Sequence, residues 1–151
     1  IAGLSSLAGI RLGAKYAMGQ SRSLLPVLFL ILAVSLAVVV PSLGLERAGS
    51  FGMSTILLSV VLGPVAQFAI GATVQARLAA LAGSSATFVF ALNASMVYFG
   101  QGLGIALGAA ALDLSGIASA PAIGTAIALT GCLLAVWLGH FTKNNFQTAR
   151  G

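Results

Sequence analysis

Charged residues are scarce in this chain. Seven Lys or Arg and two Asp or Glu make up 6% of its 151 residues, whereas a soluble domain usually carries about 25%. Such a composition cannot build an ordinary water-facing surface. A nucleic-acid partner is not expected either, because that needs Lys and Arg clustered with aromatic residues on one face.

Side chains that could act in catalysis or bind a metal are equally scarce. The sequence has one His, one Cys and two carboxylates, whereas an enzyme site needs a base with a nucleophile or a metal cluster. No phosphate loop, metal-ligand spacing or nucleotide fingerprint is present. We therefore expect no enzyme activity, metal or cofactor. Cys132 has no disulfide partner in the chain, and His140, close to Trp137, is expected to anchor a helix at a membrane interface.

Long uncharged runs are what the sequence has instead. They cover residues 23–45, 48–76, 78–112 and 114–142, and each exceeds the roughly 20 apolar residues that cross a bilayer. We predict an all-α, polytopic membrane helix bundle with spans at about 24–44, 50–74, 85–112 and 118–141. Residues 1–10 resemble the end of a further span, so the chain is expected to be a fragment of a longer protein.

The cations occupy alternate connections between these runs. Short cytoplasmic connections of membrane proteins are enriched in Lys and Arg, so the first and third connections and the C-terminal tail are predicted to be cytoplasmic. The six cations that define this side are Arg11, Lys15, Arg22, Arg77, Lys143 and Arg150. The second connection carries Glu46 and Arg47, which cancel, and the fourth carries Asp113.

Gly63 and Pro64 stand near the middle of the second run. A proline inside a helix removes one hydrogen bond and clashes with the preceding turn, so a kink is predicted there. Bent helices at this depth recur where transporters bind substrate. The alternative is a tolerated membrane proline whose freed carbonyls are satisfied by neighbouring helices.

The third run combines glycines with amides. Gly100, Gly104 and Gly108 recur at four-residue spacing, and Asn93 shares their helix face. That face is predicted to pack against protein, as small residues do in membrane helices. Gln67, Asn93 and Gln101 are the best candidates for lining a substrate cavity; the alternative is that their amides only form hydrogen bonds between helices.

Three local patterns resemble one transporter family. Residues 9–15 (GIRLGAK), which include Gly9, Arg11, Gly13 and Lys15, look like a degenerate copy of the G-x-R-L-A-D-R cytoplasmic loop that follows span eight of major facilitator superfamily transporters. Residues 75–78 (QARL) resemble the end of span ten. The Leu92-Asn93 pair, followed by the glycines, resembles span eleven. The chain departs from the family at Ala14, where an acidic residue is usual, and at residues 83–87, which lack the usual Pro-Glu.

The resemblance implies the end of span eight and spans nine to twelve, in the C-terminal six-helix half of a bacterial drug or sugar efflux protein of the inner membrane. It implies a secondary active transporter that exports drugs, sugars or small metabolites by alternating access. Its expected partners are the lipid bilayer, a small-molecule substrate and a missing N-terminal half. Any proton-coupling carboxylate is expected upstream of Ile1, because the predicted spans here contain no Asp or Glu. The alternative function is a non-transporting membrane subunit that packs through the glycine stripe.

Overall fold

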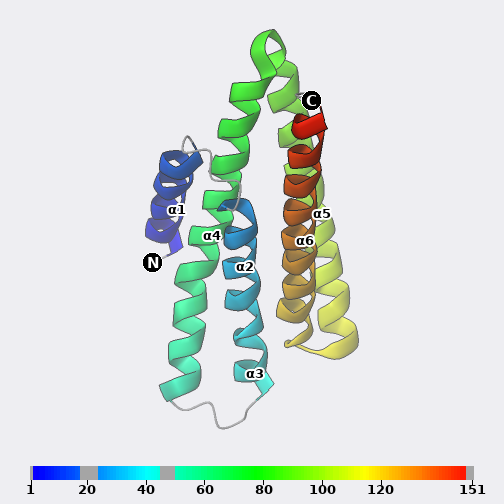
Figure 1. Ribbon diagram of the computed structural model, residues 1–151. Coiled ribbons are helices and arrows are strands. Elements are labelled where there is room, and N and C mark those ends of the chain that lie inside the picture. The colour runs from blue at the N-terminus through cyan, green and yellow to red at the C-terminus, as the bar shows by residue number, and fades with distance from the viewer. Residues whose placement is uncertain (1, 18–23, 45–49, 149–151) are drawn as a thin grey trace.

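The computed structural model describes residues 2–17, 24–44 and 50–148, which are helical except for short turns (Figure 1). The elements are α1 (Ala2–Ala17), α2 (Leu24–Ala37), α3 (Val39–Gly44), α4 (Ser50–Ala82), the 3₁₀ turn η1 (Gly83–Ser85), α5 (Ala86–Ser115) and α6 (Ser119–Thr148). The all-α prediction is confirmed for this part of the chain.

The long helices run alternately up and down. Helices α1, α4 and α6 run in one direction, and α2 and α5 run in the other (Figure 1). Helix α1 packs on α4, α4 on α2, α2 on α6, and α6 on α5. Helices α4 and α5 form a hairpin through η1 but diverge as they leave it (Figure 1). The two helices therefore contact each other little beyond the turn.

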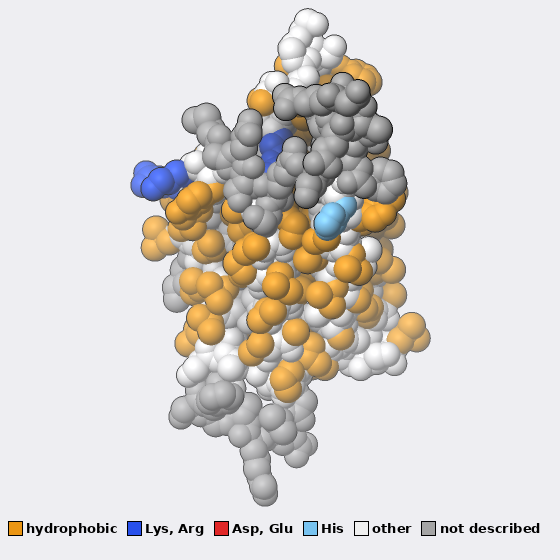
Figure 2. Space-filling model, viewed as in Figure 1, with side chains coloured by type: hydrophobic (Ala, Val, Ile, Leu, Met, Phe, Trp, Pro, Cys, Tyr) orange, Lys and Arg blue, Asp and Glu red, His pale blue; other side chains and the backbone are white. Residues whose placement is uncertain are grey.

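Small side chains form the core, and large apolar ones face outward. The most buried residues of the described helices are Gly, Ala, Ser and Thr: Ser5, Gly9, Gly13, Ala33, Ser35, Gly52, Ala66, Ala69, Thr73, Ala111 and Ala128. Leu4, Ile105 and Leu133 are each at least 70% exposed, and apolar side chains cover the middle of the molecule (Figure 2). This pattern suits a lipid surround, where close approach of backbones rather than exclusion of water holds helices together.

Within the described residues, three stretches are long and apolar enough to span a membrane. They are Leu24–Leu43, Gly52–Ser115 and Ser119–His140, and the second contains both α4 and α5. An integral membrane protein is the class that these helices fit.

Helix α1 contradicts the predicted loop at its C-terminal half. Gly9, Arg11, Gly13 and Lys15 lie in a helix that continues to Ala17. Gly9 and Gly13 are buried against α4, where an added Cβ at Gly9 would collide with the Val65 carbonyl oxygen. Arg11 follows Gly9 by two residues and Lys15 follows Gly13 by two, so each cation lies about 200° round α1 from the glycine before it, and both cations are exposed. The glycine spacing therefore serves helix packing.

Prolines affect α2, α3 and α4 differently. A turn at Val38 separates α2 from α3. Pro41 follows three residues after this turn and Ser42 four residues after it. In a continuous helix, the Pro41 ring would clash with the Ala37 carbonyl. Helix α4 is continuous through Pro64 and extends eight residues beyond the predicted limit at 74, to Ala82. Hydropathy locates the part of a helix that lipid covers, and a helix can extend past it.

A glycine ends α5 and allows the chain to reverse. Gly116 has φ 79°, a conformation that residues with a Cβ rarely adopt, and its N–H donates to the Leu112 carbonyl at 3.0 Å. The Ser119 hydroxyl lies 2.7 Å from the Ala111 carbonyl oxygen and 2.6 Å from the Gly116 carbonyl oxygen and shares its one proton between them, and the Ser119 N–H donates to the Gly116 carbonyl at 3.1 Å. These bonds fix the start of α6 beside the end of α5.

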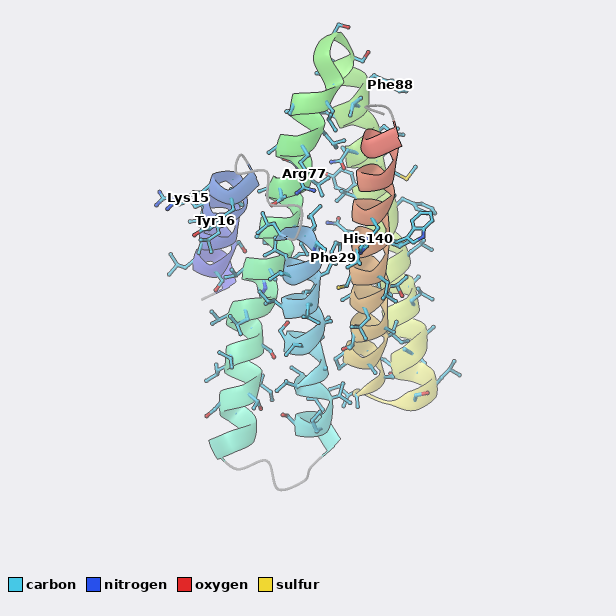
Figure 3. The ribbon with its side chains drawn as sticks, in the orientation of Figure 1. Lys15, Tyr16, Phe29, Arg77, Phe88 and His140 are labelled. Carbon is cyan, nitrogen blue, oxygen red and sulfur yellow. The ribbon has the colours of Figure 1, made fainter. Side chains whose placement is uncertain are left out.

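Two described cations, Lys15 and Arg77, lie towards one end of the bundle, as does His140 (Figure 3). Lys15 is near the end of α1, Arg77 is near the end of α4, and His140 lies towards the same end of α6 (Figure 3). The structure therefore groups the charges of the first and third connections, as predicted. Arg22, Glu46, Arg47 and Arg150 lie outside the described residues. The side of the membrane on which this end lies stays a prediction.

Candidate functional site

One cleft brings together all three residues that were predicted to line a substrate cavity. It has a volume of about 520 Å³ and lies between α4 and α5, with Ile10 of α1 at its edge. Its polar lining consists of four amides, Gln67, Gln75, Asn93 and Gln101. The remaining walls are apolar side chains and Gly71. A concave, mostly apolar site with a few polar groups is typical of small-molecule binding.

The four amides of the cleft lie at two depths along the α4–α5 hairpin. Ser84 in η1 lies 17 residues from both Gln67 and Gln101, and nine residues from both Gln75 and Asn93. Residues at equal distance from the turn of an antiparallel hairpin stand at similar depth. Gln67 therefore faces the level of Gln101, and Gln75 the level of Asn93. The two levels are about 12 Å apart along the helix axes, because eight residues separate the members on each helix.

The spacing on each helix explains why one cleft collects these residues. Gln67, Gly71 and Gln75 recur at four-residue intervals on α4, and Asn93, Val97 and Gln101 do so on α5. Residues four apart share a helix face. The centre of the α4 face is Gly71, where an added Cβ would meet nothing within 4 Å.

The amides of the cleft keep their hydrogen-bonding capacity. Within the described residues, the side chains of Gln67, Asn93 and Gln101 make no hydrogen bond to one another or to the backbone. Each amide offers two N–H donors and a carbonyl acceptor, and an amide without a partner in an apolar medium is costly. The cleft thus presents donors and acceptors to an occupant. No ionisable side chain is among its lining residues.

Other polar groups of the spans form hydrogen bonds between helices instead. The Ser42 and Thr55 hydroxyls share a hydrogen bond at 2.8 Å between α3 and α4, and Ser59 donates to the Ser35 carbonyl of α2. Cys132 of α6 donates to the Pro26 carbonyl of α2 at 3.4 Å. Gly63 adjoins this seam, since an added Cβ would stand 3.5 Å from the Ser35 hydroxyl. These residues lie at contacts between helices, and none of them lines the cleft between α4 and α5.

The glycine stripe of α5 is not packed against any described helix. An added Cβ at Gly100, Gly104 or Gly108 would meet nothing within 4 Å. No described helix makes the predicted contact with this face, because α4 and α5 diverge where the stripe lies (Figure 1), and packing against another protein segment stays a prediction. Close helix contacts at glycine occur at Gly9 and Gly13 of α1 and, on α6, at Gly131, which packs against the Phe29 ring.

Gln67, Asn93 and Gln101 were predicted because they are amides inside apolar runs, and Gln75, a further amide of the run that contains Gln67, was missed. Gln75 was assigned only to the QARL pattern at the end of the run. Its position eight residues after Gln67 was the available signal.

Comparison with models of known protein families, with curated proteins and with solved structures finds no match to this chain. Its class therefore rests on its own architecture, which is an all-α bundle with helices long and apolar enough to span a membrane.

Proposed function

We propose that this chain is part of a secondary active transporter, and that the α4–α5 cleft forms part of its substrate site. The observation that carries the proposal is the gathering of Gln67, Asn93 and Gln101, with Gln75, in one apolar cleft without hydrogen-bond partners among the described residues. Amides used only to hold helices together would be bonded to neighbouring helices, as Ser42 and Thr55 are.

The chemistry of the cleft indicates the class of substrate. A charged solute in an apolar cleft without a counter-charge would carry a large desolvation cost. Four neutral amides suit an uncharged molecule that both donates and accepts hydrogen bonds, with an apolar part to cover the walls. Neutral sugars, amphipathic drugs and small metabolites share this chemistry. Export by alternating access from the bacterial inner membrane, with the C-terminus in the cytoplasm, is part of the proposal.

The divergence of α4 and α5 supplies a physical basis for opening. The two helices are joined by η1 and make few other contacts, whereas α4 is held firmly by α1 and α2. A helix pair with this arrangement can change its separation without breaking the rest of the bundle, which alternating access requires.

Cleft-filling gives the sharpest test. In the full-length protein, Gly71→Leu places a side chain in the cleft where there is open space, so folding is expected to be kept while transport is lost. Gln67→Leu and Gln101→Leu are each expected to weaken substrate affinity about fivefold, the loss of one hydrogen bond of about 1 kcal/mol. Thr130→Val removes a hydroxyl from α6, away from the cleft, and is the matched control. Unchanged transport by Gly71→Leu would refute the site.

The alternative is a non-transporting membrane subunit, and the open glycine stripe favours it. Gly108 is seven residues from Gln101, about 10 Å along α5. If a partner helix packs on the stripe, Gly108→Leu should break the complex, whereas Gly71→Leu should leave it intact. A transporter whose cleft binds substrate predicts that Gly71→Leu is the damaging substitution. The transporter proposal therefore expects Gly71→Leu to be the more damaging variant, whereas the subunit alternative expects Gly108→Leu to be.

A further inference from the structure

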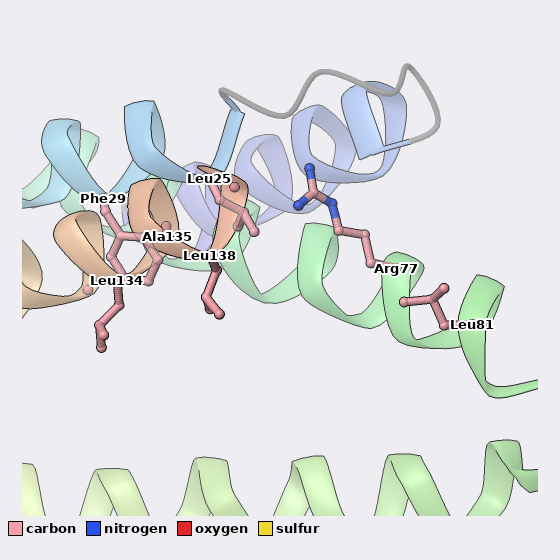
Figure 4. A pocket seen from close by; sticks show the side chains of 9 residues that line it. Leu25, Phe29, Arg77, Leu81, Leu134, Ala135 and Leu138 are labelled. Atoms are coloured by element: carbon pink, nitrogen blue, oxygen red, sulfur yellow. The ribbon is translucent and has the colours of Figure 1, made fainter. Parts of the chain in front are cut away.

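A second cleft lies between α2, α4 and α6, away from the amides. Its volume is about 550 Å³, which is within the range of about 300–1,000 Å³ found for small-molecule sites. Its walls are almost entirely apolar. The lining side chains include Leu25, Phe29, Leu81, Leu134 and Leu138, with Arg77 as the single charged group (Figure 4).

The cleft stands at the end of the membrane-length helices. Leu25 is the second residue of the apolar stretch that begins at Leu24, and Leu138 is two residues before the stretch that ends at His140. An occupant at this level would have one end among lipid headgroups and the other among acyl chains. Lys15 lies near the same end of the bundle (Figure 3).

Arg77 adds a cation to this apolar cleft. Its side chain extends from α4 on the side of Leu25, at the start of α2 (Figure 4). A guanidinium carries five N–H donors in a planar arrangement that matches phosphate oxygens, so it can hold a phosphate alongside other hydrogen bonds. Basic clefts between membrane helices on the cytoplasmic side bind anionic headgroups.

We propose that this cleft binds an anionic phospholipid, with an acyl chain between α2 and α6 and the phosphate on Arg77. Three observations support this occupant together: apolar walls that suit hydrocarbon, one cation that suits a phosphate, and a position at the boundary between the two. The proposal is independent of the transport function.

The test compares two lipids with the same acyl chains. Full-length protein in detergent is titrated with dioleoyl phosphatidylglycerol or with dioleoyl phosphatidylcholine, and bound lipid is counted by native mass spectrometry. The wild type is expected to bind the anionic lipid more tightly. Arg77→Gln is expected to lose about fivefold in affinity for phosphatidylglycerol with little change for phosphatidylcholine, which is the contribution of one basic residue near an anionic headgroup.

Lys15→Gln is the matched control, because Lys15 is an exposed cation at the same end that does not line the cleft. It should keep the preference. Ala135→Phe fills the cleft from α6 with Arg77 intact, and it should reduce binding of both lipids; this variant also decides the proposal if Arg77→Gln does not fold. Equal affinity of the wild type for both lipids, an equal loss in Lys15→Gln, or full competition by glycerol phosphate without acyl chains would each overturn the proposal.

Discussion

Replacing Gly13 by alanine is expected to weaken the contact between α1 and α4. An added Cβ would stand 2.5 Å from the Ala69 carbonyl oxygen, 2.9 Å from the Ala69 Cα and 2.9 Å from the Ala72 Cβ. None of these atoms is the movable end of a long side chain. Because ordinary contacts begin near 3.4 Å, α1 must retreat by about 0.9 Å along the closest direction. The Thr73 hydroxyl, 3.5 Å from the Gly13 carbonyl oxygen, would also lose that approach.

Two opposing effects set the size of the change. Overpacking of a close contact costs about 1–3 kcal/mol, whereas alanine is favoured over glycine inside a helix by up to about 1 kcal/mol. The net destabilisation is therefore about 0–3 kcal/mol. Gly3→Ala on the same helix measures the helix preference of alanine alone, since an added Cβ there meets nothing within 4 Å. The difference between the two variants, about 1–3 kcal/mol, measures the contact itself.

Local opening of α1 can be followed through Thr73. Its side chain is fully buried, so a Thr73→Cys thiol reacts with a soluble reagent only when α1 moves away from α4. With Cys132 replaced by serine, labelling at this site should be about five- to 100-fold faster with Gly13→Ala than with Gly3→Ala, since about 1.4 kcal/mol corresponds to tenfold. Equal labelling rates in these two variants would refute the close α1–α4 contact.

Three further outcomes are expected. Gly131→Ala should lower the melting temperature in detergent, because its Cβ would stand 2.7 Å from the Phe29 ring, and Phe29→Leu should restore much of the loss; additive effects would contradict this contact. In a cysteine-free background, Ser115→Cys should react with an impermeant thiol reagent in intact cells and Ser84→Cys only after permeabilisation, and the reverse pattern would overturn the proposed orientation. Ser119→Ala should cost about 1 kcal/mol, measured by chemical denaturation, because the Ala111 carbonyl loses its hydroxyl donor while the Gly116 carbonyl keeps the Ser119 N–H; an unchanged free energy of unfolding would show that water replaces the hydroxyl.

The class of the fold was predictable from the sequence, and the ends of its helices were not. Uncharged runs locate helices because each run must satisfy its own backbone hydrogen bonds in lipid. The same signal ends where lipid ends, so it placed the limit of α4 at residue 74 rather than at Ala82. It also missed the extension of α1 past Arg11, because an exposed cation on the outer face of a helix does not stop it.

The candidate cleft was partly predictable. Amides inside apolar runs are rare enough to single out Gln67, Asn93 and Gln101, and the structure places them around one cleft; their role in binding stays a prediction. The four-residue spacing of glycines predicted the packed faces less well, since the same spacing occurs on a face that packs against a helix and on one that does not. Which face is packed depends on the path of the neighbouring helix, and that path is set by contacts such as Gly9 on Val65, far from the stripe in sequence.

The small-residue core has a consequence for mutational tolerance. In a soluble protein, trimming a large buried side chain is the damaging change, whereas here the large side chains face outward and exchange readily for other apolar ones. Enlarging Ala66, Ala69 or Ala128 by a single methylene should do more harm than exchanging an exposed Leu for Ile. A mutational scan of this protein should therefore show its strictest positions at its smallest side chains.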